Sequence, residues 1–141
     1  MTKIQDTIII CPPAISQMAA TGALSAGREW VADHVRALAQ TRAKVREELM
    51  TLAHDGLAEI PSAQGALYFL LQPKTSRTPL DYVTQLIRAH RVAAIPGDAF
   101  GLMQGCTLRI AYGALDASTA TEGVGRLVAD RKSTRLNSSH T

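Results

Sequence analysis

Arg109 is the residue of this sequence whose position most clearly suggests chemistry. It lies in residues 107–112, TLRIAY, where apolar and polar side chains alternate. Side chains alternate between the two faces of a strand, so we expect Arg109 to point away from the apolar face of Leu108 and Ile110. A planar guanidinium held there could grip a carboxylate through two parallel hydrogen bonds. A solvated arginine on an open sheet face is the other interpretation, and this residue alone does not separate the two.

A second short strand and a turn-rich loop precede that run. Residues 92–95, VAAI, form an apolar stretch short enough for a buried strand. Pro96 and Gly97 should end it, because proline cannot donate to a strand ladder and glycine tolerates positive φ. The sequence therefore predicts two strands joined by the loop PGDAFGLMQGC.

The segments AIPGDAFG and LRIAYGAL together resemble the C-terminal part of class I/II aminotransferases. These are pyridoxal-phosphate enzymes of fold type I. In that family the arginine of the LRI strand binds the substrate α-carboxylate, and its position here is Arg109. The family's PG-x-x-FG loop, which leads towards the site, matches Pro96, Gly97, Phe100 and Gly101. Each motif is weak alone, whereas their order and spacing together are specific.

Two upstream stretches resemble the same family. QDTIIICPPAISQMAATGAL is similar to the family's connection from the large domain into the small one, and its residues 7–11 read as a short apolar strand. GALYFLL, residues 65–71, resembles the strand that opens the small-domain sheet. Because it is apolar throughout, we expect it to be buried on both faces.

Helical periodicity accounts for most of the rest. We expect one helix over residues 14–26 and a long helix over residues 27–54 with Arg42 as a snorkelling stem within its apolar stripe. That stripe comprises Val31, Val35, Leu38, Val45, Leu49 and Leu52. The long helix matches the family's interdomain helix.

Two capping signals mark later helices. Thr78 with Pro79 predicts a helix start, with Leu80, Val83 and Ile87 buried. Thr119-x-x-Glu122 has the spacing of a capping box, although Asp116 or Ser118 could cap instead. The last helix should bury Val124, Leu127 and Val128.

These elements define a fold class and a domain organisation. The order predicts an α/β (α+β) small domain, in which helices cover one face of a small sheet. Residues 1–26 would be an interdomain segment and first helix, and residues 27–129 the aminotransferase small domain. By resemblance, this is the C-terminal part of the fold-type I pyridoxal-phosphate transferase fold.

The C-terminal segment, residues 130–141, reads DRKSTRLNSSHT. Its lack of apolar periodicity predicts a disordered tail. It also resembles the translation of a common sequencing-adapter oligonucleotide, so we expect an artefact whose coding nucleotides match the adapter base for base. A natural basic tail that contacts phosphate is the alternative.

Composition limits the functional classes. The chain has 46% hydrophobic and 19% charged residues and a net charge of +3, most of it in residues 130–141. A nearly neutral body is not a nucleic-acid footprint. No apolar run reaches the length of a membrane span, and no secretory signal is visible. Cys11 and Cys106 lack metal spacing, which favours reduced thiols in a cytoplasmic protein without a metal site.

The resemblance implies a function for an intact parent. Such an enzyme moves an amino group from an amino acid to a 2-oxo acid through pyridoxal phosphate bound to a lysine, and it would act as a homodimer. None of the four lysines stands in the family's S-x-x-K setting followed by G-x-R-x-G; they are Lys3, Lys44, Lys74 and Lys132. We therefore expect an inactive fragment with Arg109 as substrate-binding residue, no catalytic residue, and cofactor-binding residues unknown.

Three alternatives remain open at this point. The first is the aminotransferase-like domain of a transcription regulator, and the second is a carbon–sulfur lyase of the same fold. The third is a free-standing binding module that uses Arg109 as its ligand anchor. Fold resemblance cannot separate these chemistries.

Overall fold

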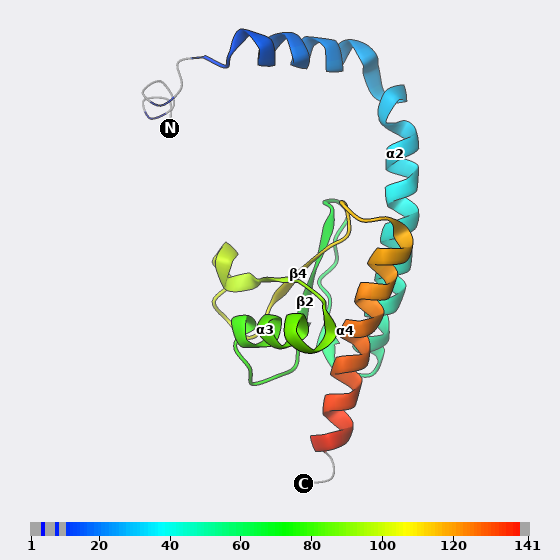
Figure 1. Ribbon diagram of the computed structural model, residues 1–141, viewed down its shortest axis with the longest axis vertical. Coiled ribbons are helices and arrows are strands. Elements are labelled where there is room, and N and C mark those ends of the chain that lie inside the picture. The colour runs from blue at the N-terminus through cyan, green and yellow to red at the C-terminus, as the bar shows by residue number, and fades with distance from the viewer. Residues whose placement is uncertain (1–3, 5–7, 9–10, 139–141) are drawn as a thin grey trace. The chain divides into compact units, whose positions relative to one another are not determined.

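The computed structural model describes residues 4, 8 and 11–138, and it divides into two compact units (Figure 1). The first unit is Met1–Ala37 and the second is Leu38–Thr141. The expected strand at residues 7–11 lies mostly outside the described residues. No helix among the described residues is long and apolar enough to cross a membrane.

Helix α2, Ala14–His54, contains a break at Gly27, where φ is 72° and ψ is −171°. A positive φ is accessible to glycine at little cost, and the two helices expected over residues 14–26 and 27–54 meet at this residue. The expected apolar stripe is buried only in its second half, at Val45, Leu49 and Leu52. Val31 and Val35, in the first unit, are exposed.

The second unit contains a four-stranded antiparallel sheet in the order β1-β2-β4-β3. Its strands are β1 Ala58–Glu59, β2 Tyr68–Pro73, β3 Ile95–Pro96 and β4 Leu108–Ala111. The bounds expected for the strand at residues 92–95 are wrong, because only Ile95 of it pairs and Pro96 continues the strand. Proline is tolerated there because β3 is an edge strand, in which the N–H that proline lacks is not needed for pairing with another strand.

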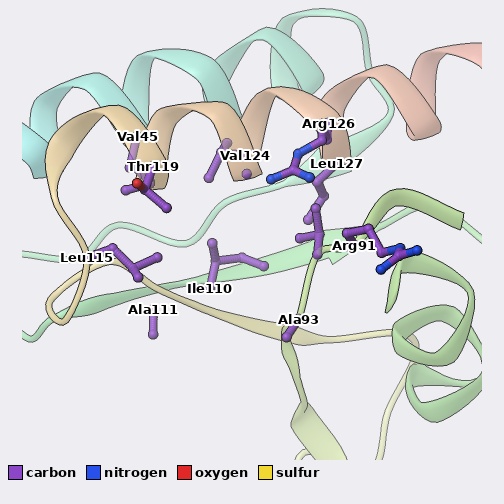
Figure 2. Close-up of a pocket in the computed structure, with 13 residues that line it drawn as sticks. Val45, Arg91, Ala93, Ile110, Ala111, Leu115, Thr119, Val124, Arg126 and Leu127 are labelled. Atoms are coloured by element: carbon purple, nitrogen blue, oxygen red, sulfur yellow. The ribbon is translucent and has the colours of Figure 1, made fainter. Parts of the chain in front are cut away.

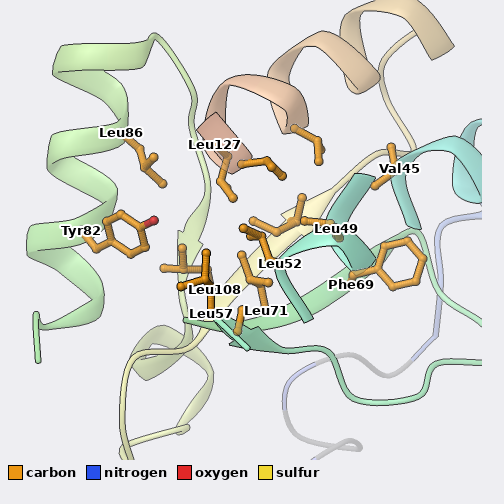
Figure 3. Packing of buried hydrophobic residues seen from close by; sticks show 14 of the residues in the cluster. Val45, Leu49, Leu52, Leu57, Phe69, Leu71, Tyr82, Leu86, Leu108 and Leu127 are labelled. Carbon is orange, nitrogen blue, oxygen red and sulfur yellow. The ribbon is translucent and has the colours of Figure 1, made fainter. Parts of the chain in front are cut away.

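The helices of the second unit bury one face of this sheet. Figure 3 shows Leu49 of α2, Leu86 of α3 and Leu127 of α4 converging on Leu71 and Leu108 of the strands. Each of these five side chains is fully buried. The small sheet with helices on one face, expected from the sequence, is therefore confirmed.

Helix α3, Pro79–His90, begins where its sequence predicts, but the face that it buries differs from the one expected. The Thr78 hydroxyl accepts a hydrogen bond from the Asp81 amide at 3.2 Å, which satisfies one of the free N–H groups of the first turn. Tyr82 and Leu86 join Val83 in the core, whereas the expected Leu80 and Ile87 are exposed. The large Tyr82 ring offers more area for burial than Leu80 does.

Helix α4, Ala117–Ser138, is capped by Asp116, one of the alternatives left open by the sequence. The Asp116 carboxylate accepts a hydrogen bond from the Thr119 amide at 2.8 Å. Hydrogen bonds from the Ser118 hydroxyl and from Thr119 hold the pKa of this carboxyl well below its usual range. The helix is thus started by an acid at its positive end.

The same helix corrects the expectation of a disordered tail, because it continues through residues 130–138. Asp130 is buried and accepts hydrogen bonds from the Tyr82 hydroxyl at 3.1 Å and from the Gln85 amide at 2.9 Å. His90 Nε2 lies 2.9 Å from the same carboxylate. Burial and then the Asp130 charge raise the pKa of Tyr82. These contacts hold Asp130, the first residue of the segment, against α3.

Candidate functional site

Arg109 leaves β4 on the face of the sheet opposite the helices. Its neighbours Leu108 and Ile110 are 0% and 7% exposed and point into the core, whereas Arg109 is half-buried. The alternation expected from the sequence therefore holds along this strand.

Two aromatic rings contact the Arg109 guanidinium. Its central carbon lies 4.3 Å from the centroid of the Tyr68 ring and 5.2 Å from that of the Phe100 ring. Both distances fall within the range of cation–π attraction. Because Leu70 pairs with Arg109 and Tyr68 pairs with Ala111, Tyr68 is the diagonal neighbour of Arg109 on one face of the sheet.

A cavity of about 360 Å³ opens in front of these side chains. Its walls are Tyr68, Leu70, Phe100, Leu102 and Arg109. The Arg109 Nε atom is buried and has no hydrogen-bond partner within the described residues. No carboxylate of that part of the chain forms an ion pair with Arg109. A cation in an apolar cavity whose N–H groups lack hydrogen-bond partners can bind an anion, because charge-assisted hydrogen bonds are strong in such surroundings.

A short 3-10 helix, η1 Gly97–Phe100, carries the second ring. The Gly97 amide donates to the Thr107 carbonyl at 2.7 Å and the Leu102 amide donates to the Gly97 carbonyl at 3.1 Å. Gly101 ends the turn with a φ of 81°. The PG-x-x-FG segment thus ties its loop to the start of β4 and places Phe100 against Arg109.

Gly97→Ala is expected to lower the free energy of unfolding by about 1–3 kcal/mol, the usual cost of overpacking. A β-carbon at Gly97 would lie 2.7 Å from the Thr107 β-carbon and 2.9 Å from the Thr107 carbonyl oxygen. Urea denaturation of the purified chain measures the change.

The matched control for that experiment is Gly123→Ala in α4. Nothing lies within 4 Å of a β-carbon there, so alanine should raise the stability by about 0.5–1 kcal/mol through helix propensity. Equal effects of the two substitutions would contradict the close approach of Gly97 to Thr107.

The sequence identified Arg109 and the loop but missed the other wall of the cavity. Residues 65–71 were expected to be buried on both faces; instead β2 alternates, with Phe69 and Leu71 buried and Tyr68 and Leu70 half-buried. The available signal was the aromatic Tyr68 directly before Phe69, because adjacent residues of a strand point to opposite faces. It becomes informative only when the register with β4 is known.

A second cavity, of about 200 Å³, lies on the helical side of the sheet (Figure 2). Its walls include Ile110, Val124 and Leu127, and Arg126 reaches it from α4. The buried Nε of Arg126, like that of Arg109, has no hydrogen-bond partner within the described residues, but the Arg126 guanidinium already donates to the His90 carbonyl at 3.2 Å and lies 3.8 Å from the Glu122 carboxylate. Arg126 is therefore a weaker candidate for binding an anion than Arg109.

Among the described residues, no group of three or more His, Cys, Asp or Glu side chains could hold a metal ion. Cys11 and Cys106 are free thiols. Burial raises the pKa of the Cys106 thiol, which keeps it in its unreactive protonated form.

Comparison with known proteins shows similarity to an aminotransferase. An aromatic aminotransferase of Arabidopsis thaliana, ISS1, is 34% identical over 128 residues, which are 90% of this chain and 31% of that protein. The chain thus spans about a third of the length of the relative it matches. No protein-family model matches the chain.

Solved structures with the same fold are also aminotransferases. The aromatic aminotransferase from Pyrococcus horikoshii OT3 superposes with a TM-score of 0.76 and 26% identity, covering 95% of this chain and 35% of that one. An aminotransferase from Mycobacterium tuberculosis gives 0.74 and 24% over 92% of this chain and 33% of the other. The aspartate aminotransferase from Rhizobium meliloti gives 0.69 and 23%, with 92% and 34% covered.

Proposed function

We propose that this chain, whose sequence and fold correspond to the C-terminal, small-domain third of fold-type I aminotransferases, belongs to an enzyme that transfers an amino group from an amino acid to a 2-oxo acid. The observation that carries the proposal is the Arg109 guanidinium at the wall of an apolar cavity, where its buried Nε has no hydrogen-bond partner within the described residues. Amino acids and 2-oxo acids both present a carboxylate, which is the partner such a guanidinium recognises.

Arg109 would hold and orient that carboxylate. Its planar fork donates two hydrogen bonds to the carboxylate oxygens in one plane, which fixes direction as well as position. Positioning of this kind lowers the barrier of the chemical step, because the reacting groups no longer lose rotational freedom on reaction. Arg109 is a binding residue in this scheme, and no proton transfer is assigned to it.

Pyridoxal phosphate would supply the electron sink for such a reaction. The residues around Arg109 do not fit that cofactor, because the cavity wall offers one cation and no lysine. Lys74 lies 3.9 Å from the Glu59 carboxylate and Lys132 lies 2.9 Å from that of Asp55. We therefore propose that the residues that bind the cofactor lie in the region of the related enzymes that this chain does not cover.

We further propose that the intact parent is a cytoplasmic homodimer that binds neither membrane nor nucleic acid. Large apolar side chains are exposed along the first unit, among them Ile15, Met18, Leu24 and Trp30. Exposed apolar side chains in such density favour a protein contact. The remaining polypeptide of the parent or its second subunit would supply that contact.

The product of the uninterrupted reading frame tests the function. We expect it to bind pyridoxal phosphate and to convert an amino acid and a 2-oxo acid into the exchanged pair, which chromatography of both products measures. Release of sulfide or thiol from a cysteine-type substrate would identify a lyase instead. Cofactor binding without turnover of any amino acid would favour a regulator.

The 141-residue chain alone is expected to show no transamination when pyridoxal phosphate is added. The cavity in front of Arg109 contains no amine that could bind the cofactor, so the electron sink cannot be placed beside the substrate. The assay compares product formed by equal concentrations of the chain and of a known aminotransferase. Turnover by the chain above the rate with free cofactor would contradict this assignment.

A further inference from the structure

We propose that Tyr68 and Phe100 are positioning residues, whose rings hold the Arg109 guanidinium so that a carboxylate binds at its edge. The identity of the anion rests on the proposed function, whereas the positioning itself rests on the geometry around Arg109. Neither ring is assigned a part in the chemical step.

The Tyr68 ring is the fixed support. It belongs to β2, the neighbour of β4, and it lies at the shorter distance of 4.3 Å from the guanidinium carbon. The strand pairing of Leu70 with Arg109 and of Tyr68 with Ala111 fixes this diagonal contact. An arginine side chain has several rotatable bonds, so a bare sheet face would leave its head free to move. Stacking on a ring restrains the plane of the guanidinium.

Phe100 approaches from a different segment, the 3-10 helix before β4, at 5.2 Å. Its side chain is 51% exposed, so it contributes little to the core and is free to serve the cavity. Contact with two rings removes water from the guanidinium but provides no hydrogen-bond acceptor in its plane. The donors of Arg109, including the buried Nε, therefore still need an acceptor.

This arrangement restricts how a ligand can bind. Ring atoms occupy space beside the guanidinium carbon, and the planar array of N–H donors remains the surface for hydrogen bonding. A flat carboxylate fits such an edge through two parallel bonds. Lysine could not replace Arg109 here, because a point charge neither stacks on the rings nor presents a fork.

The first experiment uses the 141-residue chain and needs no enzymatic activity. With arginine labelled by ¹⁵N, nuclear magnetic resonance measures rotation about the Cζ–Nε bond of Arg109, whose signal is assigned by its loss in Arg109→Lys. We expect Tyr68→Leu and Phe100→Leu each to speed this rotation several-fold, and Tyr68→Phe to leave it unchanged. Unchanged rotation in Phe100→Leu and Tyr68→Leu would overturn the positioning role.

Leu70→Met is the matched control in that experiment, because Leu70 lines the same cavity without forming a ring contact to Arg109. In Leu70→Met, the rate of rotation about the Arg109 Cζ–Nε bond should equal that in the wild type. Phe100→Leu keeps the test valid if Tyr68→Leu fails to fold, since Phe100 is half exposed. Equal acceleration in Leu70→Met and Phe100→Leu would indicate general loosening of the face and would also overturn the proposal.

The second experiment uses the intact parent. Tyr68→Leu should lower kcat/KM about tenfold, the scale of a desolvated cation–π contact, and Tyr68→Phe should lower it by less than twofold. The loss should disappear with an amine substrate that lacks the carboxylate, and in the background of Arg109→Ala. A loss that persists in both cases would show that Tyr68 acts through the fold and not through Arg109.

The two experiments separate the inference from the function on which it rests. If the intact parent does not transaminate but the Arg109 rotation responds to both ring substitutions, the proposed function fails and the positioning role stands. If the parent transaminates and neither ring substitution changes rotation or kcat/KM, the positioning role fails and the function stands.

Discussion

Arg109→Ala in the intact parent is expected to lower kcat/KM by about 10³-fold. The substitution removes two charge-assisted hydrogen bonds to the substrate carboxylate, each worth about 1.5–3 kcal/mol, and 1.4 kcal/mol corresponds to a factor of ten. It also leaves a cavity of about 360 Å³ without its one cation. Steady-state kinetics with the best amino-acid substrate measures the loss.

Arg109→Lys sharpens this prediction. Lysine retains the positive charge but not the planar fork, so it should recover less than a tenth of the lost kcat/KM. Arg88→Ala on the exposed side of α3 is the matched control and should change kcat/KM by less than twofold. A loss below about tenfold in Arg109→Ala would reject the carboxylate role, since removing even one such hydrogen bond costs that much.

Leu127→Ala is expected to lower the free energy of unfolding of the second unit by about 2–5 kcal/mol, the range for large-to-small substitutions in a core. Leu127 is 0% exposed and belongs to the cluster that joins α4 to the sheet. Because each 1.4 kcal/mol is a factor of ten, this loss would raise the ratio of unfolded to folded protein by about 30-fold to about 4,000-fold.

Urea denaturation followed by the near-ultraviolet circular dichroism of the buried Tyr82 and Tyr112 measures that loss. Fluorescence of Trp30 is unsuitable, because this residue belongs to the first unit. Leu80→Ala, at a site that is 59% exposed on α3, is the control and should cost less than about 1 kcal/mol. Similar costs at both leucines would contradict the placement of α4 against the sheet.

Features that depend on near neighbours in the chain could be read from the sequence. Thr78 caps α3 as expected, Asp116 caps α4 as one of the alternatives to the Thr119 capping box, and the break at Gly27 lies at the boundary expected between residues 26 and 27. The alternation around Arg109 is also local, because side-chain direction in a strand follows from position alone. Family resemblance at the two flanking motifs then supplied the carboxylate hypothesis for Arg109.

Tertiary structure decided which surfaces meet. Leu80 was an acceptable core residue by periodicity, yet the larger Tyr82 is buried instead, and its hydroxyl donates to Asp130, which is 48 positions away. The same contact holds Asp130, the first residue of the segment that composition predicted to be disordered, against α3. A helix has several faces apolar enough to bury, and only the opposing element selects among them.

The candidate site divides in the same way. The sequence by itself determined that Arg109 leaves the apolar face of its strand, and that a PG-x-x-FG loop precedes it. Only the tertiary structure decided that Tyr68 and Phe100 contact the guanidinium, because strand register and loop path bring together segments that share no local signal. Register is set by burial of the opposite face, where Phe69 and Leu71 must meet Leu108 and Ile110.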